Sequence, residues 1–346
     1  MAIDPQSPRR RVRYRGSHPR RFEEKYKELD PARFAAEQDK VRARGQTPAG
    51  THRPILLEAI LEVLAPRPGE RALDATLGYG GHARAVLARL APGGHLLGLD
   101  VDPLELPRTE ARLRAEGFGE DVFSVRRMNF AGLPGLLPET GAFDVVLADL
   151  GLSSMQIDNP ARGFTFKADG PLDLRMNPNR GAPASALLAK RSEAELADLL
   201  QENADEPFAG PIAAALAASA EPVTRTRQLA ALVASVLAEA GWDRRDPEVR
   251  ASQQRTFQAL RIAVNDEFGV LDAFLACLPR ALKPGGRVAI LTFHSGEDRR
   301  VKKAFQEGHR LGLYAAVAEA PVRPGPEERR DNPRSAPAKL RWAVLR

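Results

Sequence analysis

Short apolar runs alternate with segments in which apolar residues recur every three or four positions, beginning near Thr51. Buried parallel strands show nearly continuous apolar runs, whereas amphipathic helices show the three- or four-residue spacing. A first helix is expected at 54–64, where Pro54 stands in the first turn. Strands are expected at 71–77, 95–100, 122–128 and 143–150, with helices at 82–90 and 103–116. This alternation predicts a mostly parallel sheet flanked by helices.

The alternation stops after the fourth predicted strand. Residues 159–178 have the composition of a loop, and 184–240 are helical in pattern. No strand-like run returns until 286–293, which a helix at 256–282 precedes. Runs at 313–319 and 339–346 are expected to complete the sheet as an antiparallel edge pair. The prediction is an α/β fold with a doubly wound, mostly parallel, Rossmann-like sheet and a helical inserted domain.

The chain accordingly divides into three predicted parts. Residues 1–50 are expected to be a basic, partly disordered extension and linker. The sheet domain comprises 51–156 and 259–346, and the helical insertion comprises 157–258. We expect the insertion to recognise the substrate.

The positive charge of the chain is concentrated at its start. The whole sequence has 51 basic and 45 acidic residues, a net charge of +6, and residues 1–21 contain seven of the arginines and one aspartate. The remaining 325 residues therefore carry 44 charges of each sign. The arginine-rich segment is either a solvated leader or a contact to phosphates that weakens with salt. Its composition alone does not establish an RNA partner.

Cysteine and apolar content restrict the compartment. The single cysteine, Cys277, excludes an intrachain disulfide framework and is typical of a reducing cytosol. No apolar run approaches the ~20 residues that cross a bilayer, and the first residues lack the apolar core of a signal peptide. We expect a cytoplasmic, soluble protein without a membrane partner, either a monomer or a homodimer. His82 has no second ligand-type cluster near it in the sequence, so no metal is expected.

Candidate ligand-binding residues follow three of the predicted strands. The turn from Gly78 to Ala83 follows the first strand, Asp100 ends the second, and Asp149 ends the fourth. Ligands of doubly wound sheets bind beyond the carboxyl ends of the strands. Asp100 lies 20 residues after Gly80, the placement of an acid that accepts hydrogen bonds from ribose hydroxyls. The pattern predicts a site for an adenosine-containing cofactor.

Two cofactors and a structural explanation remain open for this turn. Its G-x-G-x-x-A pattern is typical of dinucleotide-binding dehydrogenases, and a purely structural glycine turn would look the same. Asp74, inside the end of the first strand, disfavours a pyrophosphate and favours the cationic amine of S-adenosylmethionine (SAM). The antiparallel last strand also favours a SAM-dependent methyltransferase over a dehydrogenase.

Beyond this turn, the sequence resembles the RsmH (MraW) family of bacterial 16S ribosomal RNA cytosine-N4 methyltransferases over residues 51–346. Seven ordered stretches of this length are more specific than a glycine turn alone. The stretches are His52–Glu58, Asp74–His82, Asp149–Gln156, Arg162–Phe164 with Asp169–Met176, Arg255–Ile262, Phe293–Ser295 and Asn332–Ser335.

The resemblance implies SAM-dependent methylation of N4 of cytidine 1402 in the decoding region of the small ribosomal subunit. It therefore implies 16S rRNA within that subunit as partner, and a methyltransferase sheet domain. The SAM contacts that it implies are Gly80, Gly81, His82, Asp100, Phe130, Asp149 and Gln156. Three positions depart from the family pattern: Gly296 replaces a leucine, Ala336-Pro337 an Arg-Ser pair, and Asn203–Glu206 a Tyr-Gly-Glu-Glu. Residues 1–50 have no counterpart in the family core.

Transfer to a cytosine amine needs acceptors beside the reacting nitrogen, because its lone pair is delocalised into the ring. Asp149, the Leu150 carbonyl and the hydroxyls of Ser153 and Ser154 are the candidate acceptors at the end of the fourth strand. Asp149 could hold SAM instead. The base must also be unstacked to reach such a pocket.

Two further residues are candidates for substrate binding. Arg175 would either reach RNA phosphate or pair with Asp173. His294, just past the fifth strand, would either contact substrate or make a local hydrogen bond. A non-catalytic RNA-binding or ribosome-assembly protein on the same scaffold is a further class, against which the intact aspartates argue.

Overall fold

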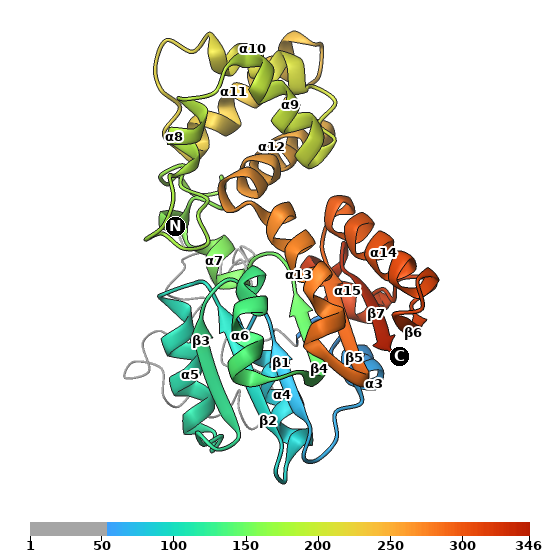
Figure 1. Cartoon of the computed structure of the whole chain (residues 1–346). Coiled ribbons are helices and arrows are strands. Elements are labelled where there is room, and N and C mark those ends of the chain that lie inside the picture. Colours follow the sequence, from blue (N-terminus) through green and yellow to red (C-terminus); the bar gives the residue numbers. More distant parts are fainter. Residues whose placement is uncertain (1–53) are drawn as a thin grey trace, which may run out of the picture. The chain divides into compact units, whose positions relative to one another are not determined.

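The structure is a computed structural model that describes residues 54–346 (Figure 1). The predictions for residues 1–50, including disorder and phosphate contact, lie outside the described residues. Within 54–346 one seven-stranded sheet has the order β3-β2-β1-β4-β5-β7-β6. Its strands are β1 (Arg71–Asp74), β2 (His95–Asp100), β3 (Phe123–Arg127), β4 (Phe143–Asp149), β5 (Leu282–Thr292), β6 (Tyr314–Val317) and β7 (Lys339–Leu345). The predicted doubly wound, mostly parallel sheet is confirmed.

The direction of the last strands also agrees with the sequence. Strands β1 to β5 pair in parallel, whereas β7 runs antiparallel to both β5 and β6. The first strand ends at Asp74, three residues earlier than predicted. There the Asp74 carboxylate accepts a hydrogen bond from the Thr76 N–H at 3.1 Å, and this two-residue turn ends the extended backbone.

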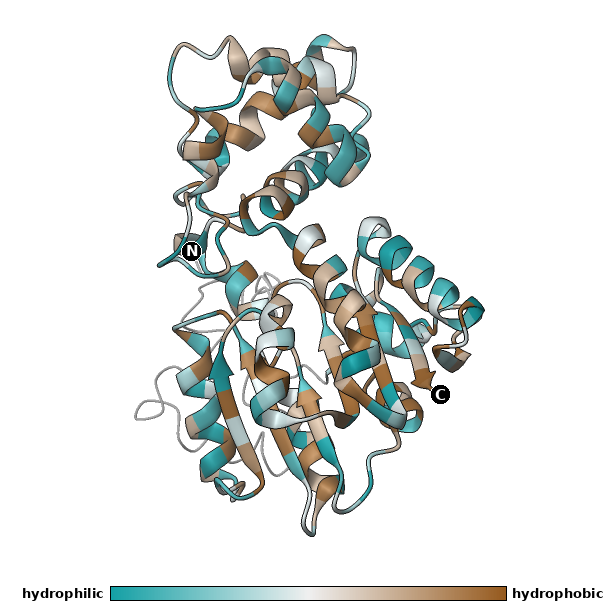
Figure 2. Ribbon diagram, in the orientation of Figure 1, coloured by the Kyte–Doolittle hydropathy of each residue, from teal (hydrophilic) through white to brown (hydrophobic). Residues whose placement is uncertain are grey.

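Helices cover both faces of the sheet, which explains the nearly continuous apolar strands (Figure 2). One face packs against α3 (Leu57–Leu64), α4 (Gly81–Leu90) and α5 (Glu105–Ala115). The other face packs against α6 (Leu133–Thr140), α13 (Glu267–Ala281) and α14 (Ser295–Arg310). Neighbouring strand residues alternate between the two cores, as Ala72 and Leu73 do in β1. Cys277 lies in the second core, as expected from its apolar helix.

The segment between β4 and β5 is helical and has an apolar core of its own. Its helices after the short α7 (Ser154–Asp158) are α8 (Ala184–Leu188), α9 (Glu193–Ala204), α10 (Ala209–Ala217), α11 (Thr226–Glu239) and α12 (Pro247–Asn265). Helix α12 continues through residue 258, so the backbone has no break at the predicted end of the insertion. The domain division itself stays a prediction.

The single helix predicted at 256–282 is wrong. The structure has two helices there, α12 and α13, separated at Asp266. Asp266 adopts a left-handed conformation with φ 50°, which interrupts the hydrogen-bonding of a right-handed helix. Aspartate tolerates this conformation better than most residues. The three- or four-residue spacing of apolar residues continues on both sides of Asp266, so the sequence pattern does not reveal the break.

None of the helices within 54–346 combines the length and the apolar character needed to cross a membrane. The chain ends with α15 (Pro326–Asp331), a short 3₁₀ helix at Pro333–Ser335, and β7. Arg334, from the Asn332–Ser335 stretch, donates to Asp158 Oδ1 at 2.6 Å and so ties the last connection to α7.

Candidate functional site

Three parallel strands end in aspartates at one edge of the sheet. Asp74 ends β1, Asp100 ends β2 and Asp149 ends β4. Strand β1 pairs with both β2 and β4, and the chain winds outward from β1 and β4 in opposite directions. Ligands of doubly wound sheets bind at such a reversal of strand order. The structure therefore brings the predicted aspartates to the expected ligand edge.

The glycine turn after β1 is held by this edge. The Gly78 N–H donates to Asp100 Oδ2 at 2.8 Å. Gly80 has φ 76°, and a Cβ added there would lie 2.9 Å from Thr109 Cγ2 on α5. A Cβ on Gly81 would lie 2.7 Å from Pro54 Cγ. Both glycines are thus required by close packing, whether or not a ligand also approaches them.

His82, in the first turn of α4, bridges two segments of the site. Its Nε2 lies 3.0 Å from the Ile55 carbonyl oxygen, and its Nδ1 lies 3.4 Å from Asp149 Oδ2. Burial disfavours the protonated ring, but the Asp149 carboxylate outweighs it and raises the pKa of His82 above its usual value. Asp149 is also fixed through its backbone, because its N–H donates to Thr76 Oγ1 at 2.6 Å.

The Asp74 carboxyl group is buried beside the other two acids. Burial raises the pKa of Asp74 to about 7, with the charges of Asp149 and Asp100 adding to it. The Thr76 N–H and the His82 ring oppose this increase. An acid with such a pKa lacks sufficient positive charge around it. A cationic ligand group would supply that charge, so the edge fits the ammonium group of an amino acid-like cofactor and not a pyrophosphate.

Asp100 and Asp102 form a tight turn after β2. Asp100 Oδ1 accepts from the Asp102 N–H at 2.8 Å, while Oδ2 accepts from Gly78. Each carboxylate oxygen has a second lone pair, so both can still accept a ribose hydroxyl. Burial raises the pKa of Asp100 above its usual value despite these two N–H donors.

Ser153 and Gln156 form the capping box of α7. The Ser153 hydroxyl accepts from the Gln156 N–H at 3.2 Å, and Gln156 Oε1 accepts from the Ser153 N–H at 2.9 Å. Gln156 Nε2 donates to Asp102 Oδ2 at 2.8 Å. The side-chain amide of Gln156 is therefore fixed at both ends, next to the turn that Asp100 begins. The proposed catalytic contact of Ser153 stays a prediction, beside its observed role as a helix cap.

Phe130 follows β3 in a short 3₁₀ helix, Phe130–Gly132. Its ring packs edge-to-face on Phe274 of α13, with centroids 5.0 Å apart. The ring is partly exposed at the same edge of the sheet as the aspartates. It can cover an adenine only through the part that Phe274 leaves accessible, so this contact stays a prediction.

Arg175 pairs with Asp173 in the structure. Its Nε and Nη2 donate to the two Asp173 oxygens at 2.8 and 2.7 Å, and Nη1 donates to the Gly181 carbonyl at 3.1 Å. Of the two alternatives for Arg175, the structure contains the ion pair. The bidentate pair leaves fewer Arg175 N–H groups for a phosphate. The contact with RNA stays a prediction.

His294 caps α14 at the carboxyl end of β5. Its Nδ1 accepts from the Glu297 N–H at 3.4 Å, and its Nε2 lies 3.2 Å from Glu297 Oε1. Burial would raise the pKa of Glu297, but His294 and Arg261 together hold it below its usual value. The local hydrogen bond expected as one alternative is present, and the contact with substrate stays a prediction.

Sequence reasoning missed the group that surrounds His294. Ligand atoms of Glu267, His294 and Glu297 lie within 4.8 Å of one another, a spacing that could hold a metal ion. However, Arg261 donates to both Glu267 oxygens at 2.7 and 2.8 Å, and its positive charge opposes a second cation. The described contacts make the group an ion-pair network, in which the buried His294 Nε2 faces Glu297 Oε1 at 3.2 Å without a hydrogen-bond partner among the described residues.

One departure from the family pattern has a structural explanation. A Cβ on Gly296 would lie 2.6 Å from Phe268 Cζ, so the aromatic ring occupies the space that a larger residue would need. In the Asn203–Glu206 stretch, Glu206 agrees with the family pattern, is fully buried and pairs with Arg255 at 2.8 Å, but nothing explains the three changes before it. Nothing in the structure explains Ala336-Pro337.

Asp102 and Arg162 are the main site residues to which the sequence analysis assigned no role. Arg162 Nη1 donates to Asp102 Oδ2 at 2.7 Å, and both side chains are more than nine-tenths buried. An acid two residues after a strand-ending acid was the only signal for Asp102. Arg162 stands in the Arg162–Phe164 stretch that resembles the family, but nothing near it in the sequence indicates a partner or a role for its side chain.

The comparisons with known proteins identify the family of the chain. The sequence profile of the MraW methylase family matches residues 49–345. Ribosomal RNA small subunit methyltransferase H 2 of Alkaliphilus metalliredigens is 51% identical over 97% of this chain and 97% of its own. The protein named methyltransferase H 1 of Lachnoclostridium phytofermentans is 48% identical over 97% and 93%, respectively. The methyltransferase H of Acidobacterium capsulatum is 41% identical over 84% of this chain and 97% of its own.

The strand order, the antiparallel β7 and the acidic residues ending β1, β2 and β4 define a Rossmann-like methyltransferase. The family profile covers nearly all of the described chain. The protein belongs to the MraW methylase family, as the sequence resemblance indicated.

The comparisons also change the picture of residues 1–50. The family profile begins at residue 49, as expected for a segment outside the family core. The Alkaliphilus and Lachnoclostridium relatives nevertheless align over 97% of this chain, which includes most of that segment. Most of this segment therefore has an aligned counterpart in these two relatives.

Proposed function

We propose that the protein transfers a methyl group from SAM to N4 of cytidine 1402 of 16S rRNA. The observation that carries the proposal is the acidic edge at β1, β2 and β4 in a chain of the methylase family. Relatives that match most of the chain are named small subunit rRNA methyltransferases, which supports the RNA substrate. The nucleotide and the atom rest on the resemblance of the sequence stretches to RsmH. Cytoplasmic action on the small ribosomal subunit follows from the same substrate.

The described residues fit SAM group by group. Asp100 would accept the ribose hydroxyls, and Phe130 would cover the adenine. Asp74, whose pKa burial raises to about 7, would face the ammonium group. Gly80, Gly81, His82 and Gln156 complete the candidate contacts. When bound, SAM supplies a methyl group on a positively charged sulfur, which makes that carbon open to attack by an amine.

Asp149 and Ser153 are the proposed acceptors for the cytosine amine. Acceptors beside N4 favour a more tetrahedral nitrogen and direct its lone pair toward the methyl carbon. The exposed part of the Asp149 side chain is 30%, and its backbone and His82 hold it in place. No strong base is needed, because the amine loses its proton only after the new bond begins to form.

The proposal is tested by mass mapping of nucleosides. Purified protein and SAM are incubated with small subunits that lack the modification, and the RNA is digested and sequenced by mass. We expect one added methyl group, on N4 of cytidine 1402. Duplex DNA in a parallel reaction stays unmodified, and equal labelling of DNA would instead indicate a DNA amino-methyltransferase. A non-catalytic assembly protein would bind subunits and leave their mass unchanged, and bound NAD, detected by fluorescence, would indicate a dehydrogenase.

Replacing Asp100 is expected to weaken cofactor binding. Asp100→Ala removes the acceptor for the ribose, and a hydrogen bond to a charged group contributes about 1.5–3 kcal/mol. Calorimetry should show S-adenosylhomocysteine (SAH) bound about 10- to 100-fold more weakly. Unchanged SAH affinity would contradict the placement of the ribose at β2.

Cofactor affinity should also depend on pH through Asp74. The folded pKa of about 7 lies above the usual aspartate value, so the group is largely neutral at pH 6 and ionised at pH 8. If the ionised form holds the ammonium group, SAH affinity rises about tenfold between these pH values. His82 loses its proton as pH rises, which makes the edge more negative and acts in the same direction. Asp74→Asn should flatten most of this dependence in calorimetry, and an equal slope in the variant would place the ammonium elsewhere.

A further inference from the structure

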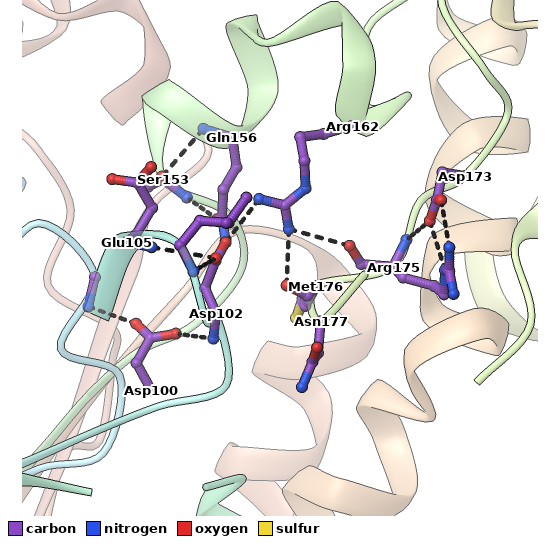
Figure 3. A network of polar contacts seen from close by, with 12 residues as sticks. Asp100, Asp102, Glu105, Ser153, Gln156, Arg162, Asp173, Arg175, Met176 and Asn177 are labelled. Atoms are coloured by element: carbon purple, nitrogen blue, oxygen red, sulfur yellow. Dashed lines mark hydrogen bonds and ion pairs between the residues drawn. The ribbon is translucent and has the colours of Figure 1, made fainter. Parts of the chain in front are cut away.

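Asp102 joins two candidate cofactor contacts, Asp100 and Gln156. Its backbone N–H donates to Asp100, and its carboxylate Oδ2 accepts from Gln156 Nε2 and from Arg162 Nη1 (Figure 3). Its Oδ1 accepts from the N–H groups of Leu104 and Glu105 at 2.9 and 3.3 Å. The side chain is only 1% exposed. Asp102 therefore ties the proposed ribose acid to α7.

The Arg162 guanidinium extends this connection to a second loop. While Nη1 donates to Asp102, Nη2 donates to the carbonyl oxygens of Arg175 and Met176 at 3.2 and 2.7 Å (Figure 3). The planar guanidinium can serve a carboxylate and two carbonyls at once, which an ammonium group cannot do in this geometry. Arg162 thus joins the cofactor edge to the loop that carries Arg175, a candidate RNA contact.

That loop is in turn bound to the end of α12. The Met176 N–H donates to Asn265 Oδ1 at 2.7 Å, and Asn265 Nδ2 donates to the carbonyls of Leu174 and Arg261, both at 2.8 Å. Arg162 precedes helices α8 to α12 in the chain, and Asn265 is the last residue of α12, beyond the predicted end of the insertion. The chain before α8 and the end of α12 therefore belong to one hydrogen-bonded network.

The network continues to His294. Arg261, one turn before Asn265, donates to both oxygens of Glu267, and Glu267 faces His294 and Glu297. The two candidate substrate contacts, Arg175 and His294, thus both connect to the proposed cofactor contacts Asp100 and Gln156. The path between these pairs passes through Arg162.

We propose that Arg162 is a positioning residue that couples cofactor binding to RNA binding, an inference that rests on the proposed function. A cofactor on Asp100 and Gln156 would order the Asp102–Arg162 pair and the 173–176 loop. RNA that then binds the ordered loop no longer loses that conformational freedom, so each ligand strengthens binding of the other. By linkage, the strengthening is the same factor in both directions.

The test is a binding cycle with wild-type protein, SAH and unmethylated small subunits. Subunit affinity is measured by filter binding with and without saturating SAH, and SAH affinity by equilibrium dialysis with and without subunits. We expect each ligand to strengthen the other by about fivefold or more in the wild type. In Arg162→Lys, which keeps the charge next to Asp102 but cannot serve both carbonyls, the factor should fall below about twofold.

A matched control is Arg287→Lys. Arg287 donates to both Glu70 oxygens and to the carbonyls of Leu64 and Ala65, so its contacts are of the same kind. It lies near the amino end of the parallel strands, where β5 pairs with the start of β4, away from the aspartates. This variant should retain the wild-type coupling factor, because Arg287 is not part of the path between the two sites. A coupling factor that fell here as well would indicate general destabilisation of the fold.

Asn265→Ala removes the hydrogen bonds of Asn265 to Met176 and Leu174, and so interrupts the same path without altering the buried charge of Asp102. It should also lower the coupling factor, even if Arg162→Lys fails to fold. A coupling factor below twofold in the wild-type protein would overturn the inference. So would a factor in Arg162→Lys or Asn265→Ala as large as that of the wild type. Absence of methyl transfer by the wild-type protein would instead overturn the proposed function, and the two failures are therefore distinguishable.

Discussion

Arg162→Met should lower the free energy of unfolding by about 3–5 kcal/mol, the range expected when one partner of a buried ion pair is removed. Arg162 and Asp102 are 7% and 1% exposed, so water cannot replace the lost partner of the carboxylate. The variant also leaves the carbonyls of Arg175 and Met176 without their donor. Urea unfolding followed by circular dichroism measures the difference.

Two comparisons separate the buried charge from lost packing. Arg162→Met combined with Asp102→Asn removes both charges and should recover a large part of the stability. Arg287→Met breaks a pair whose side chains are 14% and 16% exposed, and its loss should be smaller because water can approach Glu70. A loss below 1 kcal/mol in Arg162→Met would show that Asp102 finds another partner or becomes neutral.

The strand and helix pattern of the sheet domain could be predicted because each strand is buried on two faces. Such strands appear as apolar runs regardless of their neighbours, and glycines mark their ends. The break between α12 and α13 could not be predicted in this way. It depends on one residue, Asp266, in a left-handed conformation, and the apolar spacing around it continues almost unchanged.

The aspartates of the site were also predictable, because each stands at or near the end of an apolar strand and parallel strands end at the same edge. Asp102 and Arg162 were not. Their importance depends on burial and on an ion pair between residues 60 positions apart, which local spacing does not reveal. Ser153 and His294 were predicted as site residues, and the structure shows both as helix caps, a role that their position after a strand did not distinguish. A polar residue after a strand can be an active-site group, a cap, or both.

Asp149→Asn should lower kcat by about 10²–10³-fold, the effect of removing one electrostatic contact to the reacting group. The amide keeps the size of the side chain but loses the negative charge that favours the developing positive charge on the amine. Methyl transfer to small subunits at saturating SAM gives kcat, and calorimetry gives the SAH affinity. We expect SAH affinity to change by less than about threefold, which is well below the effect on kcat. If instead SAH affinity falls while kcat at saturating SAM is unchanged, Asp149 holds the cofactor and not the amine.

The same variant has a readout that does not require activity. Burial disfavours the protonated His82 ring, and the Asp149 carboxylate reverses this to raise the His82 pKa. Without that carboxylate, burial dominates and the His82 pKa should fall below its usual value, which an NMR titration of the ring protons measures. Asp144→Asn is the matched control, because Asp144 lies at the other end of β4 and pairs with Lys283 at 2.7 Å. It should leave both kcat and the His82 pKa unchanged. A His82 pKa that stays high in Asp149→Asn would show that another acid, Asp74, supports the protonated ring.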